Sequence, residues 1–340
     1  MKSFVEIDDK FIPAHQLPAS IIDLAMARGI NMQKFLRGTG IFYEDIKKQN
    51  LYVSPVQTLS LIEKAQQQIA GYDSSFLLGQ RLFPGNYGHL SEALMHSKNL
   101  HDFLRILFCH LTEINPFIHA QVSQCNDKLV VQFSDAIGCG ENYPFLLEMY
   151  LTALSSTLKY LAKQRITIAY QFSYKRPRYI QEYEENLGFK ISFEQADDML
   201  FLSINDFEIS FPRYSQLIRA HALNKLKQQK TQKKITFLQA ILRLQKLYGP
   251  LTQEEAACKL GLSTATFKRK LKRHNTRYLA LQDLYHRQQT VIYLLNHHNN
   301  NEMLAAEMGF TDVANFRRAF KRWFKMTPSE FKSRYQLSTC

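Results

Sequence analysis

The sequence predicts an α+β domain followed by an all-α domain, in which a long helix joins two similar helix-turn-helix motifs. Three observations lead to this prediction. The spacing of apolar residues changes from helical to alternating near residue 117. One pattern, consisting of a helix, a glycine, a short turn and a basic helix, occurs twice after residue 250. The excess of Lys and Arg is confined to that same part of the chain.

Helical spacing dominates the first third of the chain. Residues 18–48 carry apolar side chains three and four positions apart, with a break at Gly38-Thr39-Gly40. Ser54-Pro55 is typical of a helix start, because serine caps the first turn and proline tolerates its first position. Further helices are expected over 76–82, 90–94 and 100–111.

The following residues supply the predicted strands. Residues 117–124 and 128–134 alternate well enough to form a hairpin. A long apolar helix is expected over 143–163. The apolar residues of the hairpin and of this helix either line a cavity or form a plain core. Strands over 166–174 and 199–204, a helix over 179–187 and an extended stretch over 189–193 complete an α+β domain of residues 1–218.

A polar stretch follows this domain. Residues 219–234 are rich in Lys and Gln and show no apolar period, so they predict an interdomain linker.

The all-α domain, residues 235–336, starts with a helix that ends at Gly249-Pro250. Thr252 and Glu255 then form the pattern of a capping box at the next helix, which Gly261 ends. The basic helix after it has Phe267 and Leu271 four positions apart, so both are expected to face the core.

The second copy of the pattern runs from Gly309 into a basic helix that Thr311 is expected to cap. Its core-facing side chains are predicted to be Phe316, Phe320, Trp323 and Phe324. Thr327 and Glu330 have the spacing of a capping box, so they predict the start of one more helix. A long helix over 277–295 is expected to connect the two copies.

Charge separates the two halves of the chain. Residues 224–340 hold 22 Lys and Arg against 7 Asp and Glu, whereas residues 1–223 hold 21 against 23. A basic excess on the part that carries the repeated motif is typical of a phosphate-binding surface. The alternative is that the apolar stripes are ordinary core faces and the basic residues are solvated.

Other classes of protein lack support in the sequence. There is no GxxxxGK[ST], HExxH or GxSxG motif and no dinucleotide-binding glycine fingerprint, so we expect no enzyme, no cofactor and no metal site. The five cysteines are scattered, and neither a signal peptide nor a membrane span is visible. These features predict a cytoplasmic protein.

The repeated motif resembles the DNA-binding domain of the AraC/XylS-type transcription regulators. The resemblance rests on TQEEAACKLGLSTATFKRKLK and on GFTDVANFRRAFKRWFKMTPSEFK, and it covers residues 235–336. Lys325 stands where that family usually has glycine. A weaker resemblance, in LGQRLFPGNYGHLSEALMHSKNLHDFL and LGFKISFEQADDMLFLSINDFEISFP, links residues 18–215 to the arabinose-binding-type domain of one branch of the family.

The resemblance implies which residues meet DNA. Positions that reach base edges in the family are occupied by Ala265, Lys268 and Arg269 on the first basic helix and by Ala314, Asn315 and Arg318 on the second. Arg pairs bidentately with guanine and Asn with adenine. Either phosphate contacts or solvated charges are expected of the other cations, namely Lys270, Lys272, Arg273, Arg317, Lys321 and Arg322.

The resemblance also implies a function and its partners. We expect a sequence-specific transcription regulator, more in keeping with an activator than a repressor, whose partners are double-stranded DNA and RNA polymerase. The N-terminal domain is expected to bind a small effector or to form a homodimer. The alternative from another class is a non-specific architectural DNA-binding protein, which the large, near-neutral N-terminal domain disfavours.

Overall fold

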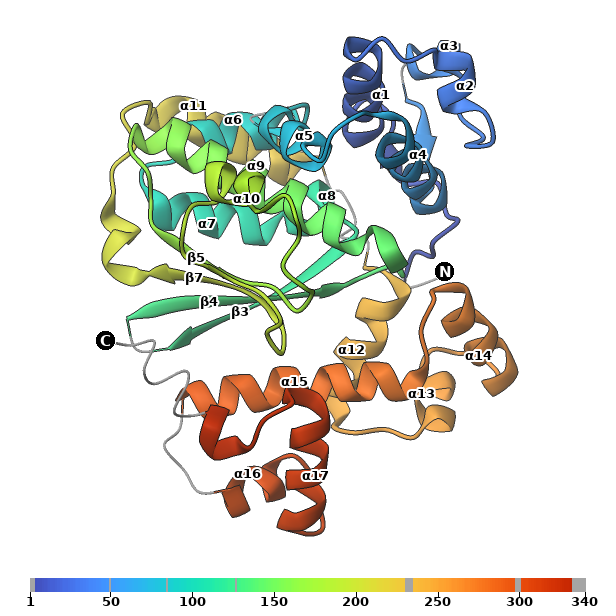
Figure 1. The fold of residues 1–340 in the computed structure, drawn as a ribbon, viewed down its shortest axis with the longest axis vertical. Coiled ribbons are helices and arrows are strands. Elements are labelled where there is room, and N and C mark those ends of the chain that lie inside the picture. The colour runs from blue at the N-terminus through green and yellow to red at the C-terminus, as the bar shows by residue number, and fades with distance from the viewer. Residues whose placement is uncertain are drawn as a thin grey trace.

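A computed structural model describes residues 4–48, 50–83, 85–125, 127–229, 235–296 and 301–331. The main sheet has five strands. Figure 1 shows it in the middle of the molecule, with most N-terminal helices on one side of it and the C-terminal helices on the other. The sheet is therefore shared by both halves of the chain.

The elements from β1 to α4 form a small, mainly helical unit that projects from the rest of the N-terminal half (Figure 1). Its longest helix starts at Ser54-Pro55, as the sequence predicted, and Ser54 forms a capping box with Gln57. The stretch 18–48 contains three helices. The predicted break at Gly38-Thr39-Gly40 is present, and Gly29, which also adopts a positive φ, makes a second one. Its elements are β1 (Ile12–Pro13), α1 (Leu17–Ala27), α2 (Met32–Leu36), α3 (Tyr43–Ile46), β2 (Tyr52–Val53) and α4 (Pro55–Gln68).

The larger part of the N-terminal half packs helices on the main sheet. The strands lie in the order β3-β4-β7-β5-β6, and only β5 and β6 run parallel. The predicted hairpin is confirmed, since β3 and β4 pair antiparallel along their whole lengths. The elements are α5 (Ser74–Leu82), α6 (His89–Met95), α7 (Leu100–Cys109), α8 (Leu111–Ile114), β3 (Ile118–Cys125), β4 (Lys128–Asp135), α9 (Tyr143–Ala162), β5 (Ile168–Gln171), α10 (Ile180–Asn186), β6 (Ile191–Ser192) and β7 (Asp198–Ser203).

Alternation along β4 and β7 gives the sheet two apolar faces. Val131 and Leu200 belong to the core that the N-terminal helices cover. Their neighbours Val130 and Met199 point the opposite way and belong to an apolar cluster with Val291 and Phe316 of the C-terminal half. The two halves are thus held together by hydrophobic burial as well as by polar contacts.

The predicted linker is partly wrong. Residues Gln216–Gln228 form a helix, α11, that packs on α6 with Ala222 fully buried. Arg219 at its start donates to both oxygens of Asp102, at 2.6 Å each. The sequence did not predict this helix, because its buried face is narrow and Lys and Gln dominate its other positions. Residues 230–234, the rest of the predicted linker, lie outside the described residues.

The C-terminal half is entirely helical among its described residues. Its helices are α12 (Phe237–Tyr248), α13 (Gln253–Lys259), α14 (Thr264–Arg273), α15 (Tyr278–Asn296), α16 (Asn301–Glu307) and α17 (Val313–Phe324). The predicted Thr252–Glu255 capping box is present. Lys325, at the end of α17, adopts the left-handed conformation with φ +58° that glycine would adopt without strain.

A loop after β4 forms the main polar contact between the halves. Asp135 accepts hydrogen bonds from the backbone N–H of Ile137, Gly138 and Cys139, at 2.6–2.9 Å, which holds the loop in a tight turn. The carbonyls of this loop are thereby turned toward the C-terminal half. We call residues 135–139 the β4 loop.

Three consecutive carbonyls of the β4 loop receive side chains from the C-terminal half. Thr236 donates to the carbonyl of Ala136, His274 Nδ1 to that of Ile137 at 2.7 Å, and Asn275 to that of Gly138 at 3.0 Å. Burial lowers the pKa of His274, so its ring is neutral and Nδ1 carries the proton that the carbonyl accepts.

Gly138 is required at this contact for two reasons. Its φ is +93°, which disfavours any other residue. A Cβ at this position would also lie 2.4 Å from the carbonyl oxygen of His274.

An ion pair with a buried carboxylate lies beside this contact. Arg287 of α15 approaches Asp197, just before β7, at 3.4 Å. Burial raises the pKa of Asp197 to about 6, against the opposing effect of the Arg287 charge.

We expect Gly138→Ala to separate the two halves locally. Gly38 provides a matched control, since its φ is +85° and no atom lies within 4 Å of an added Cβ. Gly38→Ala should lower stability only through the strain of a positive φ at alanine. Gly138→Ala should in addition speed hydrogen exchange in residues 235–241 and 271–278. Equal exchange of these segments in both variants would show that the halves are not packed together at Gly138.

We expect Asp197 to make stability depend on pH. Because its folded pKa is raised, its favourable contribution is present below the unfolded pKa and is lost as pH rises through about 6. The free energy of unfolding of the wild type should therefore fall, relative to Asp197→Asn, between about pH 4 and pH 6. Urea unfolding measures the free energy of unfolding of both proteins. A wild-type value that stays constant or rises relative to that of Asp197→Asn over this pH range contradicts the burial of the carboxyl.

Candidate nucleic-acid interface

The unit α13–α14 is built as its sequence pattern predicts. Gly261 ends the turn after α13 with φ +67°, and Ser263 caps α14 by accepting a hydrogen bond from the N–H of Thr266 at 3.2 Å. Phe267 and Leu271 are buried against α12 and the start of α15. The buried stripe fixes which side of α14 faces outward.

The outward side of α14 carries the residues expected to meet DNA on this helix. All of them, Ala265, Lys268, Arg269 and Lys272, are exposed. Their side chains lie on one continuous surface, which is suitable for contact with a groove.

Two other cations of α14 are not solvated in the expected way. Lys270 Nζ lies 2.5 Å from Glu6 Oε2, and its side chain is only 16% exposed. Arg273 pairs with Asp8 at 2.6 Å. The N-terminal segment therefore neutralises one flank of α14. The expectation of a solvated charge is wrong for Lys270, which is paired with Glu6.

The unit α16–α17 repeats the construction with a different cap. Gly309 has φ +74°, but the N-cap of α17 is Asp312 rather than the expected Thr311. Asp312 Oδ1 accepts from the N–H of Asn315 at 2.6 Å. A carboxylate at this position interacts favourably with the positive end of the helix dipole. The four predicted core side chains, Phe316, Phe320, Trp323 and Phe324, are all buried.

The outward side of α17 is also exposed, and two of its residues are joined. Ala314, Asn315, Arg318 and Lys321 are all accessible. Asn315 donates to Asp312 and accepts from Arg318 at 2.6 Å. These hydrogen bonds hold the two side chains together on one turn of the helix.

Arg322 is held against the connecting helix. It lies 2.6 Å from Asp283 of α15, which also accepts from the indole N–H of Trp323 at 2.8 Å. The guanidinium is therefore exposed but tethered. The sequence did not indicate this contact, because Asp283 and Arg322 are far apart along the chain.

The connecting helix α15 packs against both units. Leu281 belongs to the apolar cluster of the first unit, and Val291 belongs to that of the second. His286 stacks on Trp323 with ring centroids 5.6 Å apart and an interplanar angle of 11°. Burial lowers the pKa of His286, so its ring packs as a neutral group.

The described residues show neither a metal cluster nor a membrane-spanning helix. In these ranges no group of three His, Cys, Asp or Glu side chains is arranged to hold a metal ion. No helix of the described chain has the length and apolar character needed to cross a membrane.

Comparisons with known proteins agree on both halves. The model of the arabinose-binding N-terminal domain of AraC transcription regulators matches residues 29–209, and a helix-turn-helix domain model matches residues 256–334. An ornithine utilization regulator of Pseudomonas aeruginosa is 23% identical to this chain over 98% of this chain and 99% of the relative.

Two more distant similarities were found. An uncharacterised helix-turn-helix transcriptional regulator of Mycobacterium bovis is 30% identical over 83 residues, which is 24% of each chain. The crystal structure of the transcriptional regulator CdpR from Pseudomonas aeruginosa covers 93% of this chain and 97% of its own, with 16% identity and a TM-score of 0.40.

The match to the N-terminal domain model spans more than half of the 340 residues, and the helix-turn-helix match lies in the C-terminal part of the chain. The chain belongs to the AraC-type family of transcription regulators.

Proposed function

We propose that this chain is a sequence-specific DNA-binding regulator that reads two successive major grooves, with α14 in one and α17 in the other. One observation carries the proposal. Each helix buries an aromatic side chain, Phe267 or Phe316, and exposes an arginine two positions later, Arg269 or Arg318. The two units are proposed to be helix-turn-helix motifs joined by α15.

The length of α15 supports a two-groove arrangement. The helix has 19 residues, which corresponds to about 28 Å at 1.5 Å per residue. Successive major grooves on one face of B-DNA lie about 34 Å apart. A connecting helix of this length suits two readers separated by one turn of DNA.

We divide the exposed residues between base reading and phosphate contact. Base edges are assigned to Ala265, Lys268, Arg269, Ala314, Asn315 and Arg318, whereas Lys272, Lys321 and Arg322 are assigned to phosphates. Arginine offers the bidentate fork that matches guanine, and the alanines offer only a methyl contact to thymine. For Arg322, a phosphate contact would compete with Asp283.

We propose that the N-terminal domain, residues 1–218, controls the DNA-binding domain, residues 235–336. The contacts of Lys270 with Glu6 and of Arg273 with Asp8 support this, because they connect α14 directly to the N-terminal segment. The signal is proposed to be a small effector or the formation of a homodimer. Activation and contact with RNA polymerase are proposed from the family resemblance, and a cytoplasmic location is proposed from the features of the sequence.

The alternative function, non-specific architectural binding, predicts equal affinity for all duplexes. The affinity for a site selected from a random DNA pool, compared with the affinity for random DNA, separates the two functions. Specific binding exceeds non-specific binding by roughly a thousandfold or more.

We expect Arg269→Ala and Arg318→Ala each to relax the preference for a single base pair. Each change should cost roughly 1–3 kcal/mol on the preferred site, and the two affected positions should lie about one helical turn apart. Arg269→Lys and Arg318→Lys should relax the preference as well, because lysine keeps the charge but lacks the bidentate fork. Binding sites selected from a random pool by each protein provide the measurement.

Arg243 provides the control for these changes. It is exposed like the other two but lies on α12, so Arg243→Ala should recover the wild-type motif. If Arg269→Ala and Arg318→Ala both recover the wild-type motif, the two arginines do not read bases.

We expect Lys321→Ala to weaken binding to all sequences alike. Losing one phosphate contact should lower the slope of log K against log salt concentration by about one unit. Lys246 on α12 is also exposed, and Lys246→Ala should leave affinity and slope unchanged. Titrations over a range of salt concentrations measure both quantities. An unchanged slope for Lys321→Ala would rule out its proposed role.

A further inference from the structure

One carboxylate lies between the connecting helix α15 and the helix α17. Oδ1 of Asp283 accepts hydrogen bonds from two consecutive residues of α17, the guanidinium of Arg322 at 2.6 Å and the indole N–H of Trp323 at 2.8 Å. Consecutive side chains of a helix point about 100° apart. A single acceptor that holds both therefore limits the rotation of α17 about its own axis.

The indole of Trp323 is the more constrained of the two donors. Its side chain is 6% exposed, one ring face stacks on His286 of α15, and Phe310 meets it at an interplanar angle of 63°. His286 follows Asp283 by three positions, so both lie on the same side of α15. Stacking alone lets the indole turn within its plane, whereas the hydrogen bond to Asp283 gives the N–H one direction. A buried indole N–H without an acceptor is costly.

Arg322 connects this contact to the outward side of α17. It follows Arg318 by four positions, so the two side chains lie one above the other along the helix. The side chain of Arg322 is 57% exposed and that of Asp283 is 26% exposed. An ion pair this exposed is weak, so a DNA phosphate can take the place of Asp283.

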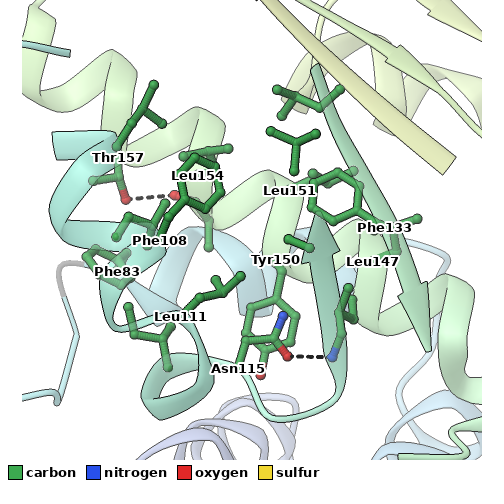
Figure 2. Close-up of a pocket in the computed structure, with 18 of the residues that line it drawn as sticks. Phe83, Phe108, Leu111, Asn115, Phe133, Leu147, Tyr150, Leu151, Leu154 and Thr157 are labelled. Carbon is green, nitrogen blue, oxygen red and sulfur yellow. Dashed lines mark hydrogen bonds between the residues drawn. The ribbon is translucent and has the colours of Figure 1, made fainter. Parts of the chain in front are cut away.

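The C-terminal part of α15 packs on the N-terminal half. Val291 lies in one apolar cluster with Val130 of β4 and Met199 of β7. The other face of these strands lines an apolar cavity of about 70 Å³. Figure 2 shows side chains of α9 and β4 pointing into this cavity from one side and side chains of α7 and α8 from the other. One layer of backbone therefore separates the cavity from α15.

We propose that Asp283 is a positioning residue for α17. It sets the orientation of α17 on α15 through the indole N–H of Trp323, and it holds Arg322 until a phosphate replaces it. α17 thus follows any movement of α15 against the sheet. The assignment rests on the proposed function, in which α17 reads bases, and deepens it by naming the residue that sets the angle of this helix.

Two changes at position 283 separate the acceptor from the charge. Asp283→Asn keeps an oxygen that can accept the indole N–H and removes the negative charge. Asp283→Leu removes both and keeps the branched shape of the side chain. We expect Asp283→Asn to select the complete wild-type motif from a random DNA pool.

Asp283→Leu should lose only one half of the motif. The base pairs that Arg318→Ala affects should become degenerate, and affinity for the preferred site should fall on the order of tenfold. The base pairs that Arg269→Ala affects should keep their preference, because α14 is held by the packing of Phe267 on Tyr278, with ring centroids 5.7 Å apart. This retained half also shows that the variant is folded.

The charge of Asp283 is tested through Arg322. Asp283→Asn releases the guanidinium, so it should bind all sequences about two- to fivefold more tightly. The same change made in Arg322→Ala should bring no such gain. A gain of equal size in Arg322→Ala would mean that Asp283 repels DNA as a general charge and does not act on Arg322.

A readout without DNA keeps this assignment separate from the proposed function. Trp323 is the only tryptophan of the chain, so collisional quenching of its fluorescence by acrylamide measures access to this one indole. Quenching should rise in Asp283→Leu and stay at the wild-type level in Asp283→Asn. Glu254, exposed on α13, provides the control, and Glu254→Gln should leave both the quenching and the selected motif unchanged.

Two results would overturn the positioning role. One is a complete wild-type motif selected by Asp283→Leu, and the other is quenching in Asp283→Leu that equals that of the wild type. A wild-type protein that selects no motif would instead count against the proposed function. The quenching results would still decide whether Asp283 positions Trp323.

Discussion

The packing of the main chain at Gly138 is the constraint on which the arrangement of the two halves depends. The β4 loop can approach His274 so closely only because position 138 has no Cβ and because Asp135 holds the turn from inside. This approach brings the loop carbonyls to Thr236, at the start of α12, and to His274, at the end of α14. A single turn after one strand therefore positions the start of α12 and the end of α14.

Hydrophobic burial acts in the same place. Because neighbouring residues of a strand point to opposite faces, β4 and β7 contribute to the N-terminal core and to the C-terminal cluster at once. The sheet thus packs against the N-terminal helices on one face and against the C-terminal helices on the other. A change on its N-terminal face, where the apolar cavity lies, is separated from the C-terminal half by one layer of backbone.

Local signals allowed much of this structure to be predicted from the sequence. The capping pair Thr252 and Glu255, the left-handed glycines 261 and 309, and the aromatic stripe of α17 each depend on residues within one or two helical turns. The alternation of the β3–β4 hairpin is equally local. The exposed faces of α14 and α17 follow directly from their buried stripes.

Features that depend on distant residues were not predicted. Glu6 and Asp8 lie more than 250 residues before their partners on α14, and no local pattern links them. The tether between Asp283 and Arg322 is of the same kind. Helix α11 was interpreted as a linker because its buried face is narrow and the residues around it are Lys and Gln. The cavity could not be told from a plain core, because both are lined by the same types of residue.

Guanine methylation interference on a site selected from random DNA tests the two-groove account most directly. With the full chain bound, the account predicts two groups of guanines whose N7 methylation blocks binding, on one face of the duplex and about one helical turn apart. Arg269→Ala should remove the sensitivity of one group and Arg318→Ala that of the other. A single group of sensitive guanines would contradict the claim that α14 and α17 read successive major grooves.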